Sequence, residues 1–253
     1  MADKMIIKDE GYVLNAQKYG ENACLVSIFS KNKGKIVGYS TDGKSKRLRG
    51  VFEAGNKIFF EASFRLEENM KRIFRVELVE ANAVNMMMDF KRLELMTAVI
   101  PFMMKVLNEN EEVYPLYEVA EKFFSAQNLK EMFMWYAYFE FYLLEYLGIS
   151  LSLDCCAVTG CLDNLMYVSP KTGKAVCAKI GEPYKDKLFL YPKFVVDKNY
   201  TPSYMEIFNV LKMTEYFLKM NFFKFHNVKM PESRERIWQL IEKEMDKNNE
   251  VIA

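Results

Sequence analysis

A short basic stretch near the amino terminus holds the residues of this sequence best suited to bind a charged ligand. Seven cations occur there within nineteen residues, and Asp42 is the only acid among them. The cations are Lys31, Lys33, Lys35, Lys44, Lys46, Arg47 and Arg49. Aromatic residues lie in or near the same stretch: Tyr12, Tyr19, Phe29, Tyr39 and Phe52. Cations that meet phosphates, beside rings on which bases stack, are typical of sites for single-stranded nucleic acid.

We therefore predict a binding site for single-stranded nucleic acid formed by these cations together with Tyr39. Basic loops would hold the sugar-phosphate backbone, and exposed tyrosines would stack on bases without reading the sequence. The other interpretation is that the aromatic residues belong to the core and that the lysines are simply solvated. The sequence leaves both interpretations open.

The same stretch matches the phosphate-binding loop of nucleotide hydrolases, because Gly38–Ser45 fits G-x-x-x-x-G-K-[ST] at every position. That loop works only between a parallel strand and a long helix, where backbone N–H groups surround a phosphate. Here the flanking residues resemble a β-meander, and Gly50 follows six residues after Lys44. We therefore expect a loop rich in glycine and lysine. A hydrolase that uses Gly43, Lys44 and Ser45 is kept as an alternative.

Four of the five cysteines gather in one region, at positions 155, 156, 161 and 177. A structural zinc site usually needs two cysteine pairs of the form C-x₂₋₄-C. Cys156 and Cys161 have an acceptable spacing, but Cys177 has no second cysteine nearby, since Ile180 stands at the matching position. We expect no metal and no other cofactor, with Cys156, Cys161 and Cys177 as weak candidates for zinc.

No combination of residues suggests catalysis. His226 is the only histidine, so it cannot form a histidine cluster or a Cys/His triad, and we expect it at the surface or in packing. Glu140 and Glu145 are five residues apart on a predicted helix and do not share a face closely. We therefore predict that the chain is not an enzyme.

The amino-terminal part is predicted to form short strands, because apolar and aromatic residues partly alternate between turn signals. The expected strands are Ile6–Leu14, Cys24–Phe29, Lys35–Tyr39, Lys57–Phe64 and Phe74–Glu80. Between the third and the fourth, Lys44–Val51 is expected to be a helical turn or a loop. Five or six strands in about 80 residues suit a small barrel of the OB type. We assign residues 1–82 to this nucleic-acid-binding domain.

The rest of the chain, residues 83–253, is predicted to be helical, and the fold class is therefore α+β. The expected helices are Met86–Leu107 with a kink or break at Pro101, Val113–Ala126, a buried central helix from Met132 to a stop at Gly148, Pro202–Met220 after an N-cap at Thr201, and Pro231–Lys247. A loop-rich insert, residues 151–192, interrupts them, with up to two short strands around Leu165–Val168 and Ala175–Cys177. Ile237, Leu240, Ile241 and Met245 form an apolar stripe on the last helix.

The charge of the chain is unevenly distributed. The net charge is +1, but residues 1–82 hold fifteen Lys and Arg against eleven Asp and Glu. A basic front part hints at a polyanionic partner, although two solvated surfaces would give the same count. The start of the sequence has no apolar run long enough for a signal peptide, and the few cysteines do not make a disulfide framework. We expect a cytoplasmic protein.

Several motifs follow one another in order along the chain. At the front these are Gly11–Leu14, Tyr19-Gly20-Glu21, Phe29-Ser30 and the basic segment Gly43–Gly50. The central motif is the most specific and consists of Phe139-Glu140, Leu143-Leu144-Glu145, Leu147-Gly148, Leu153-Asp154, Cys156 and Gly160. Together with Tyr167–Val176 and Pro231–Arg236, these motifs resemble the RecO family of bacterial DNA repair proteins, and the resemblance spans nearly the whole chain. The order and spacing of the motifs carry it, because each motif alone is loose.

The resemblance implies an amino-terminal OB-fold, a helical domain and, in many members, an inserted zinc-ribbon-like element. It implies binding of single- and double-stranded DNA, strand annealing and cooperation with the partner protein RecR. It also implies contact with the carboxy-terminal tail of single-strand-binding protein, so that recombinase loads onto coated DNA. It implies no nucleotide hydrolysis. A third hypothesis, from the sequence alone, is a scaffold whose barrel binds only protein.

This sequence departs from the zinc-bearing form of the family, which has two C-x₂-C pairs. Thr159 and Ile180 occupy the second position of each pair and leave Cys156 and Cys177 as single survivors. We therefore expect a degenerate zinc-ribbon-like insert that keeps its fold without metal. Packing of Leu162, Leu165, Tyr167 and Val176 is expected to stabilise it.

Overall fold

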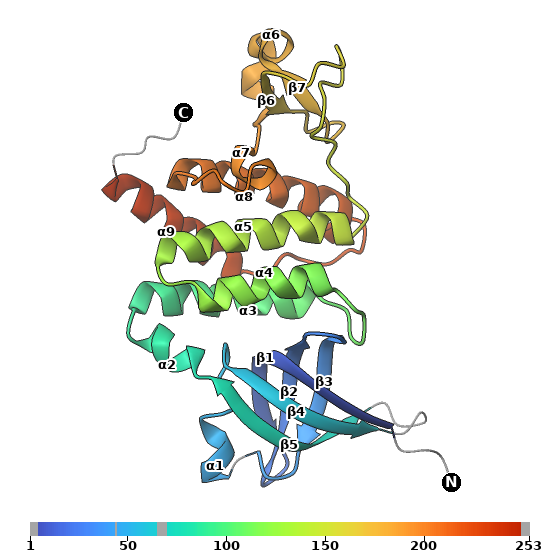
Figure 1. The fold of residues 1–253 in the computed structure, drawn as a ribbon, viewed down its shortest axis with the longest axis vertical. Helices are drawn as coiled ribbons and strands as arrows, with labels where there is room; N and C mark the ends of the chain where they lie inside the picture. Colours follow the sequence, from blue (N-terminus) through green and yellow to red (C-terminus); the bar gives the residue numbers. More distant parts are fainter. Residues whose placement is uncertain (1–4, 44, 65–69, 249–253) are drawn as a thin grey trace. The chain divides into compact units, whose positions relative to one another are not determined.

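The computed structural model describes residues 5–43, 45–64 and 70–248. Its ribbon is shown in Figure 1. Contacts divide the chain into two compact units. The first unit comprises Met1–Met132 and Pro231–Ile237, and the second comprises Phe133–Met230 and Trp238–Ala253. That residues 1–82 and 83–253 form two separate domains stays a prediction.

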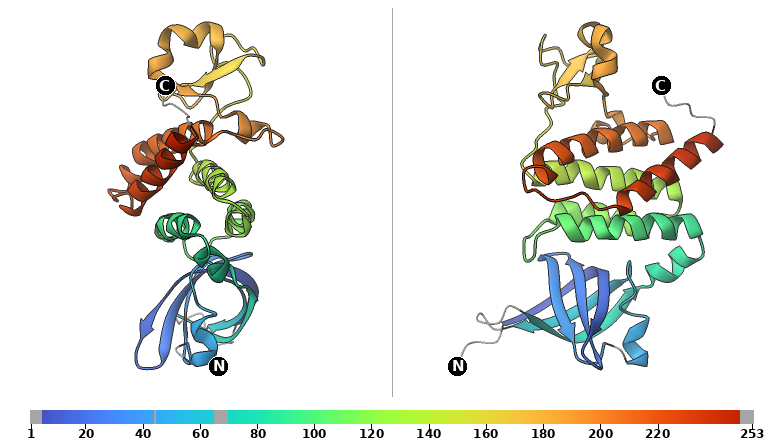
Figure 2. Two further views of the ribbon diagram at one scale, coloured as in Figure 1. Left: turned by 90° about the vertical axis from the view of Figure 1, so that its left-hand side faces the viewer. Right: turned by 180° about the vertical axis from the view of Figure 1, so that it is seen from behind.

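The first unit begins with a closed five-stranded barrel, visible as a ring in Figure 2. Its strands are β1 Met5–Tyr19, β2 Ala23–Ser30, β3 Gly34–Ser40, β4 Lys57–Phe64 and β5 Lys71–Glu80. They follow one another around the barrel in the order β1-β2-β3-β5-β4, and the β3–β5 pair is the parallel one. This arrangement confirms the predicted OB-type barrel. β1 is longer than expected because an irregularity between Val13 and Asn15 bends it, so that it pairs with both β2 and β4.

The barrel interior is filled by side chains that alternate along the strands. β3 shows the period of two clearly, since every second residue from Gly34 to Ser40 is buried. The helical turn α1, Lys46–Arg49, adds Leu48 to this core, and Phe52 follows it. The expected helical turn or loop in Lys44–Val51 is therefore a helical turn at Lys46–Arg49, while Lys44 lies outside the described residues.

Three helices complete most of the first unit: α2 Asn82–Met87, α3 Phe90–Val106 and α4 Tyr114–Ser125. The expected single helix Met86–Leu107 is interrupted at residues 88 and 89, and most of its length forms α3. Of the kink or break expected at Pro101, the break is wrong. Asp89 caps α3 by accepting hydrogen bonds from the backbone N–H groups of Lys91 and Arg92. α3 continues through Pro101 without ending.

The second unit contains most of α5 Leu129–Tyr146, together with α7 Lys193–Val196, α8 Tyr204–Leu218, the π-helical turn η2 Lys219–Phe223 and much of α9 Ser233–Lys247. α5 is the predicted central helix, and it ends as expected at Gly148, which has φ +75°. Within the described residues, no helix has both the length and the apolar character needed to span a membrane.

Two of the expected helix starts need correction. α8 is capped by Ser203 and not by Thr201, because Ser203 and Glu206 form a reciprocal capping box. α9 begins at Ser233, two residues after Pro231. The predicted apolar stripe of α9 is confirmed, since Ile237, Leu240, Ile241 and Met245 are all buried.

The insert forms a small sheet of three strands in the order β7-β6-β8. β6 Leu165–Val168 and β7 Ala175–Cys177 are the two strands expected from the sequence, and β8 Phe189–Leu190 was not predicted. The short helix α6 Ala178–Gly181 and the 3₁₀ helix η1 Glu182–Lys187 connect β7 to β8. With the barrel, the helices and this insert, the predicted α+β fold class is confirmed.

The turn between β2 and β3 depends on Gly34, which has φ +61° and lies against the connection between α3 and α4. A Cβ atom at this position would lie 1.8 Å from the carbonyl oxygen of Glu111. Gly20, in the turn between β1 and β2, has a similar φ of +68° but no described atom within 4 Å of such a Cβ.

We expect Gly34→Ala to destabilise the protein more than Gly20→Ala. Both variants place a side chain in the left-handed region, at a cost of about 1–2 kcal/mol. The steric overlap at Gly34 should add on the order of 1–3 kcal/mol to the loss in free energy of unfolding. Urea denaturation followed by circular dichroism measures both, and equal losses would contradict the close approach to Glu111.

Candidate nucleic-acid interface

The predicted basic stretch is divided between the two ends of β3. Its first part lies in and beside the turn between β2 and β3, next to the connection between α3 and α4. There the Lys33 ammonium pairs with Glu112, and Lys35 donates to the backbone carbonyl of Met104 at 3.0 Å. Burial lowers the pKa of Lys35. The Lys35 ammonium group is therefore already hydrogen-bonded within the protein, and Lys31 is half-buried.

The second part of the basic stretch lies on α1 and is exposed. Ser45 caps this turn by accepting from the N–H of Leu48 at 3.3 Å. Because Leu48 points into the barrel core, its neighbours Lys46, Arg47 and Arg49 project into solvent. Arg47 lies 3.2 Å from Asp42, but both side chains are more than half exposed, so the pair is weak and the cation stays accessible.

The aromatic residues of the barrel also fall into two groups. Tyr12 and Phe29 are completely buried, and Phe52 belongs to the barrel core. For these three the interpretation as core residues is correct, and they are not available to stack on bases.

Tyr19 and Tyr39 form an accessible aromatic pair on the outer face of β1, β2 and β3. Tyr19 is 47% exposed and Tyr39 is half-buried. Their ring centroids are 6.3 Å apart with an angle of 39° between the rings. Tyr39 pairs with Leu25 on β2, which in turn pairs with Gln17 on β1. We call the outer surface that carries Tyr19, Tyr39, Leu25, Gln17 and Arg72 the barrel face.

Arg72 is a residue of the barrel face that sequence reasoning missed. It is exposed, and β5 pairs with β3 so that Arg72 lies opposite Tyr39. The two residues are 33 positions apart in the chain. Only the closure of the barrel brings them together, so no local pattern in the sequence could have revealed this neighbour.

The match to the phosphate-binding loop lacks the structure that the loop requires. Gly38, Tyr39 and Ser40 are the end of β3, a barrel strand, and the helix that follows Ser45 has only four residues. A phosphate-binding loop needs a parallel α/β unit with a long helix at this place. The part of the loop that the structure describes therefore fits the expected glycine-rich turn and not a nucleotide site.

Comparison with known proteins agrees with the resemblance found in the sequence. A model for the recombination protein O N-terminal region matches residues 5–82, and a model for the recombination protein O C-terminal region matches residues 87–210. The chain belongs to the RecO family. This family consists of non-enzymatic DNA repair proteins, in agreement with the prediction that the chain is not an enzyme.

Individual RecO proteins match along nearly their whole length. The DNA repair protein RecO of Bartonella tribocorum is 33% identical over 240 residues, which cover 93% of this chain and 95% of that protein. The RecO of Wolbachia sp. subsp. Drosophila simulans is 36% identical and covers 90% of this chain and 96% of its own length. The RecO of Rickettsia canadensis is 31% identical, with 94% and 97% covered.

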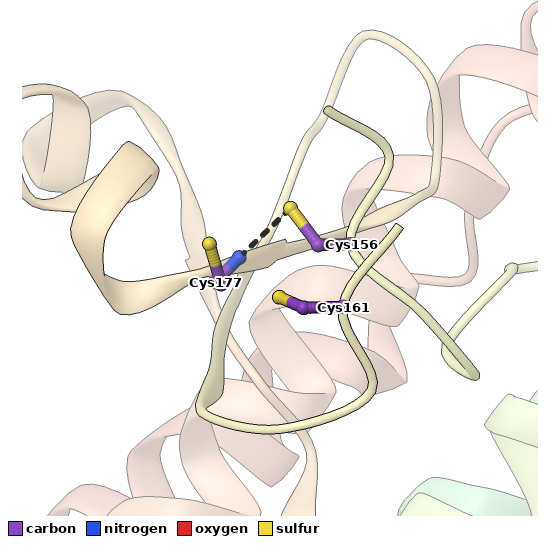
Figure 3. Close-up of side chains that lie close together, drawn as sticks. All are labelled: Cys156, Cys161 and Cys177. Carbon is purple, nitrogen blue, oxygen red and sulfur yellow. Dashed lines mark hydrogen bonds between the residues drawn. The ribbon is translucent and has the colours of Figure 1, made fainter. Parts of the chain in front are cut away.

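Three cysteines converge in the insert of this RecO-family chain, as Figure 3 shows. The sulfur atoms of Cys156, Cys161 and Cys177 all lie within 4.8 Å of one another. The backbone N–H of Cys177 donates to Cys156 Sγ at 3.4 Å, and the Thr159 hydroxyl donates to Cys161 Sγ at 3.1 Å. Burial opposes ionisation of the Cys156 thiol and would raise its pKa. Hydrogen bonds from the Thr159 side chain and from the backbone N–H groups of Cys177, Thr159 and Val158 outweigh this effect and lower the pKa of Cys156 to about 6.

The cysteine cluster does not fit the two-pair zinc site that the resemblance implies. Structural zinc sites almost always have four protein ligands, and this cluster offers three thiols. Thr159 takes the place of the fourth, with its hydroxyl 3.8 Å from Cys177 Sγ, and a neutral hydroxyl is not a usual zinc ligand. The sequence had suggested Cys156 and Cys177 as isolated survivors, whereas the structure brings both of them to Cys161.

Packing around the cluster replaces part of what a metal would provide. Tyr167, Val176, Cys156 and Cys177 are buried together, and Leu165 packs against them. The expected contribution of Leu162 is wrong, because this side chain is 71% exposed and faces solvent. Ile180 and Leu188 pack against the cluster in its place.

We expect the purified protein to contain less than one zinc per chain and to keep its melting temperature in the presence of a chelator. The reason is that the three thiols leave a tetrahedral site incomplete. Metal analysis and thermal unfolding with and without EDTA measure this. Cys161→Ser removes a member of the cluster, and Cys155→Ser is the matched control. Stoichiometric zinc that is lost only in Cys161→Ser would contradict the expectation.

Proposed function

We propose that this RecO-family chain is a DNA-binding recombination mediator that holds single-stranded DNA on the barrel face. The observation that supports this most directly is the accessible Tyr19–Tyr39 pair with Arg72 opposite Tyr39 on the next strand. Two neighbouring rings offer stacking surfaces for bases, and a guanidinium beside them can meet a phosphate. Neither contact reads the base sequence, as a mediator that acts on any damaged site requires.

The exposed cations of α1 extend the proposed site. β3 ends one residue after Tyr39, and α1 begins at Lys46, so both lie at the same end of the barrel. We propose that Lys46, Arg47 and Arg49 hold the backbone of the strand that stacks on the tyrosines. Lys44 lies outside the described residues and is proposed as a further contact on its place in the sequence.

At the other end of β3, the proposal assigns smaller roles to the remaining lysines. Lys33 and Lys35 are already bound to Glu112 and to the carbonyl of Met104. A phosphate would have to displace these contacts, so we propose Lys31, Lys33 and Lys35 as auxiliary contacts for a longer strand.

Annealing follows from this mode of binding. A protein that holds a strand by its backbone leaves the pairing edges of the bases free to meet a complementary strand. We further propose that the chain works with RecR, contacts the carboxy-terminal tail of single-strand-binding protein, and helps recombinase load onto coated single strands in the bacterial cytoplasm. Binding of double-stranded DNA is part of the same proposal. These roles rest on membership of the RecO family.

Two other functions were open from the sequence. The nucleotide hydrolase depends on Gly43, Lys44 and Ser45, and turnover of ATP with or without DNA would support it. The protein-only scaffold would show no shift of single-stranded DNA in a gel at low salt. Both outcomes would contradict the proposed function.

Replacing Lys46, Arg47 and Arg49 together by Ala should make the salt dependence of single-strand binding less steep. Each phosphate neutralised on a single strand contributes about 0.7 to the slope of log K against log salt, so three lost cations should reduce it by about 2. Lys174→Ala/Lys179→Ala is the control and should change the slope little, because these two exposed lysines belong to the insert and lie outside the proposed site. Fluorescence anisotropy with oligothymidine over a salt series gives both slopes, and an unchanged slope in the triple variant would refute the assignment.

Tyr39→Ala should weaken binding of oligothymidine by about 1–3 kcal/mol, the usual contribution of a base stacked on a ring. Tyr39→Phe keeps the ring and should bind like the unchanged protein. Tyr12→Phe serves as a control, because Tyr12 is completely buried and cannot reach a base. The same anisotropy measurement at fixed salt decides, and a Phe variant as weak as the Ala variant would argue against stacking.

A further inference from the structure

A second cation-lined site lies within the second unit, in a cavity of about 670 Å³ between the insert and α8. One wall is formed by η1 and β8 and carries Lys185 and Lys187, while the other is formed by α8 and carries Lys212 and Tyr216. We call this cavity the lysine cleft. None of its residues takes part in the barrel face.

The lysine cleft has more positive charge than its neighbours neutralise. Lys185 lies 3.3 Å from Glu182, in an exposed pair of little strength. Lys187 and Lys212 make no ion pair with any residue in the described part of the chain, and both are exposed. Asp186 is the acidic residue that lines the cleft. Three cations on two opposing walls therefore meet two carboxylates, those of Asp186 and Glu182, and the positive charge left over favours an anionic ligand between the walls.

An aromatic ring lies beside these cations and is held in place. Tyr216 is 38% exposed, and its ring packs against Phe189 and Phe217 with centroid distances of 5.3 and 5.5 Å. This packing restricts the ring while leaving part of it accessible from the cleft. A second exposed ring, Tyr184, lies next to Lys185 in η1.

We propose that the lysine cleft binds a segment of single-stranded nucleic acid that is separate from the strand held on the barrel face. A polyphosphate backbone satisfies cations on both walls, and a base provides the flat partner for Tyr216. An acidic peptide would satisfy the lysines but would leave the held ring without a partner. A single phosphate would use only part of the cavity.

This inference deepens the proposed function, because a protein with one strand on each of two sites can hold both partners of an annealing reaction. Each strand would be held by its backbone, with its bases available for pairing. The two sites lie in different compact units, so each can be changed without altering the residues of the other.

Photo-crosslinking of the full-length protein to 4-thiothymidine oligonucleotides, followed by peptide mapping, tests the proposal. We expect crosslinks in two places, one at the barrel face and one in peptides that contain Tyr184 or Tyr216. In a Lys187→Glu/Lys212→Glu variant, the crosslinks at the lysine cleft should fall about tenfold while those at the barrel face remain, because two phosphate contacts are lost and become repulsive. Lys174→Glu/Lys179→Glu makes the same change in charge on exposed residues of the insert outside the cleft and should have no effect.

The outcomes separate this inference from the proposed function. Crosslinks at the barrel face without any at the cleft would overturn the second site and leave the first. Crosslinks at the cleft that persist in a Lys46→Glu/Arg47→Glu/Arg49→Glu variant would support the second site even if the barrel face failed. If an octaglutamate peptide displaces the oligonucleotide from the cleft at equal concentration, the cleft is a site for acidic peptides and the nucleic-acid assignment is wrong.

Discussion

The contact between the barrel and α4 decides which surface of the first unit is free for a ligand. Tyr12 on β1 stacks on Phe124 at 4.5 Å, and Phe29 on β2 meets Tyr117 edge-on at 5.5 Å. Burial raises the pKa of both tyrosines, and within the described residues neither hydroxyl has a hydrogen-bond partner. Each unpaired hydroxyl costs about 1–3 kcal/mol, so the burial of four large rings must outweigh a substantial penalty.

An ion pair at the edge of the contact between the barrel and α4 helps to set the orientation of α4. Lys57 on β4 lies 2.6 Å from Glu121 on α4, and Glu10 and Glu80 are within 4 Å. Burial would lower the pKa of Lys57, but these three carboxylates raise it. A cation among three carboxylates tolerates little rotation of α4 over the barrel. Because α4 covers one side of the barrel, a ligand has access to the other outer surface of β1, β2 and β3, which carries Tyr19, Leu25 and Tyr39.

The sequence predicted the elements better than it predicted their neighbours. β4, β6 and β7 have the expected bounds, because a period of two between turn signals is a local property of the chain. The break between α2 and α3 was missed because Pro101 is a strong local signal, whereas Asp89 works as a cap only in its actual backbone conformation. The same limit explains the aromatic residues: Tyr12 and Tyr19 look alike in sequence, and only the position of α4 makes one of them core.

The candidate sites show the same limit in their charges. The basic stretch suggested one patch, but β3 runs through its middle, so Ile36–Ser40 of this strand separate Lys35 and the cations before it from the cations of α1. Arg72 joins Tyr39 through barrel closure, and Cys161 joins Cys177 through the fold of the insert, and neither contact has a sequence signature. Spacing rules for cysteine pairs assume that each ligand pair lies on one turn. Here Cys156 and Cys161 share a turn, closed by the Cys156 N–H bond to the carbonyl of Cys161, while Cys177 arrives from a strand.

A common arrangement of side chains links the barrel face and the lysine cleft. In each, an accessible tyrosine is held by another ring, and cations without a strong internal partner lie on neighbouring elements. Lysines that the protein uses for its own stability, such as Lys35 and Lys57, are partly buried and bound to a carbonyl or to carboxylates. The distinction between these two kinds of lysine depends on burial and partners, which the sequence does not contain. Because buried and paired lysines cannot bind a ligand, a count of cations in the sequence overestimates the number of charges in a binding site. The exposed cations on α1 and in the lysine cleft are the ones that a polyanion can reach.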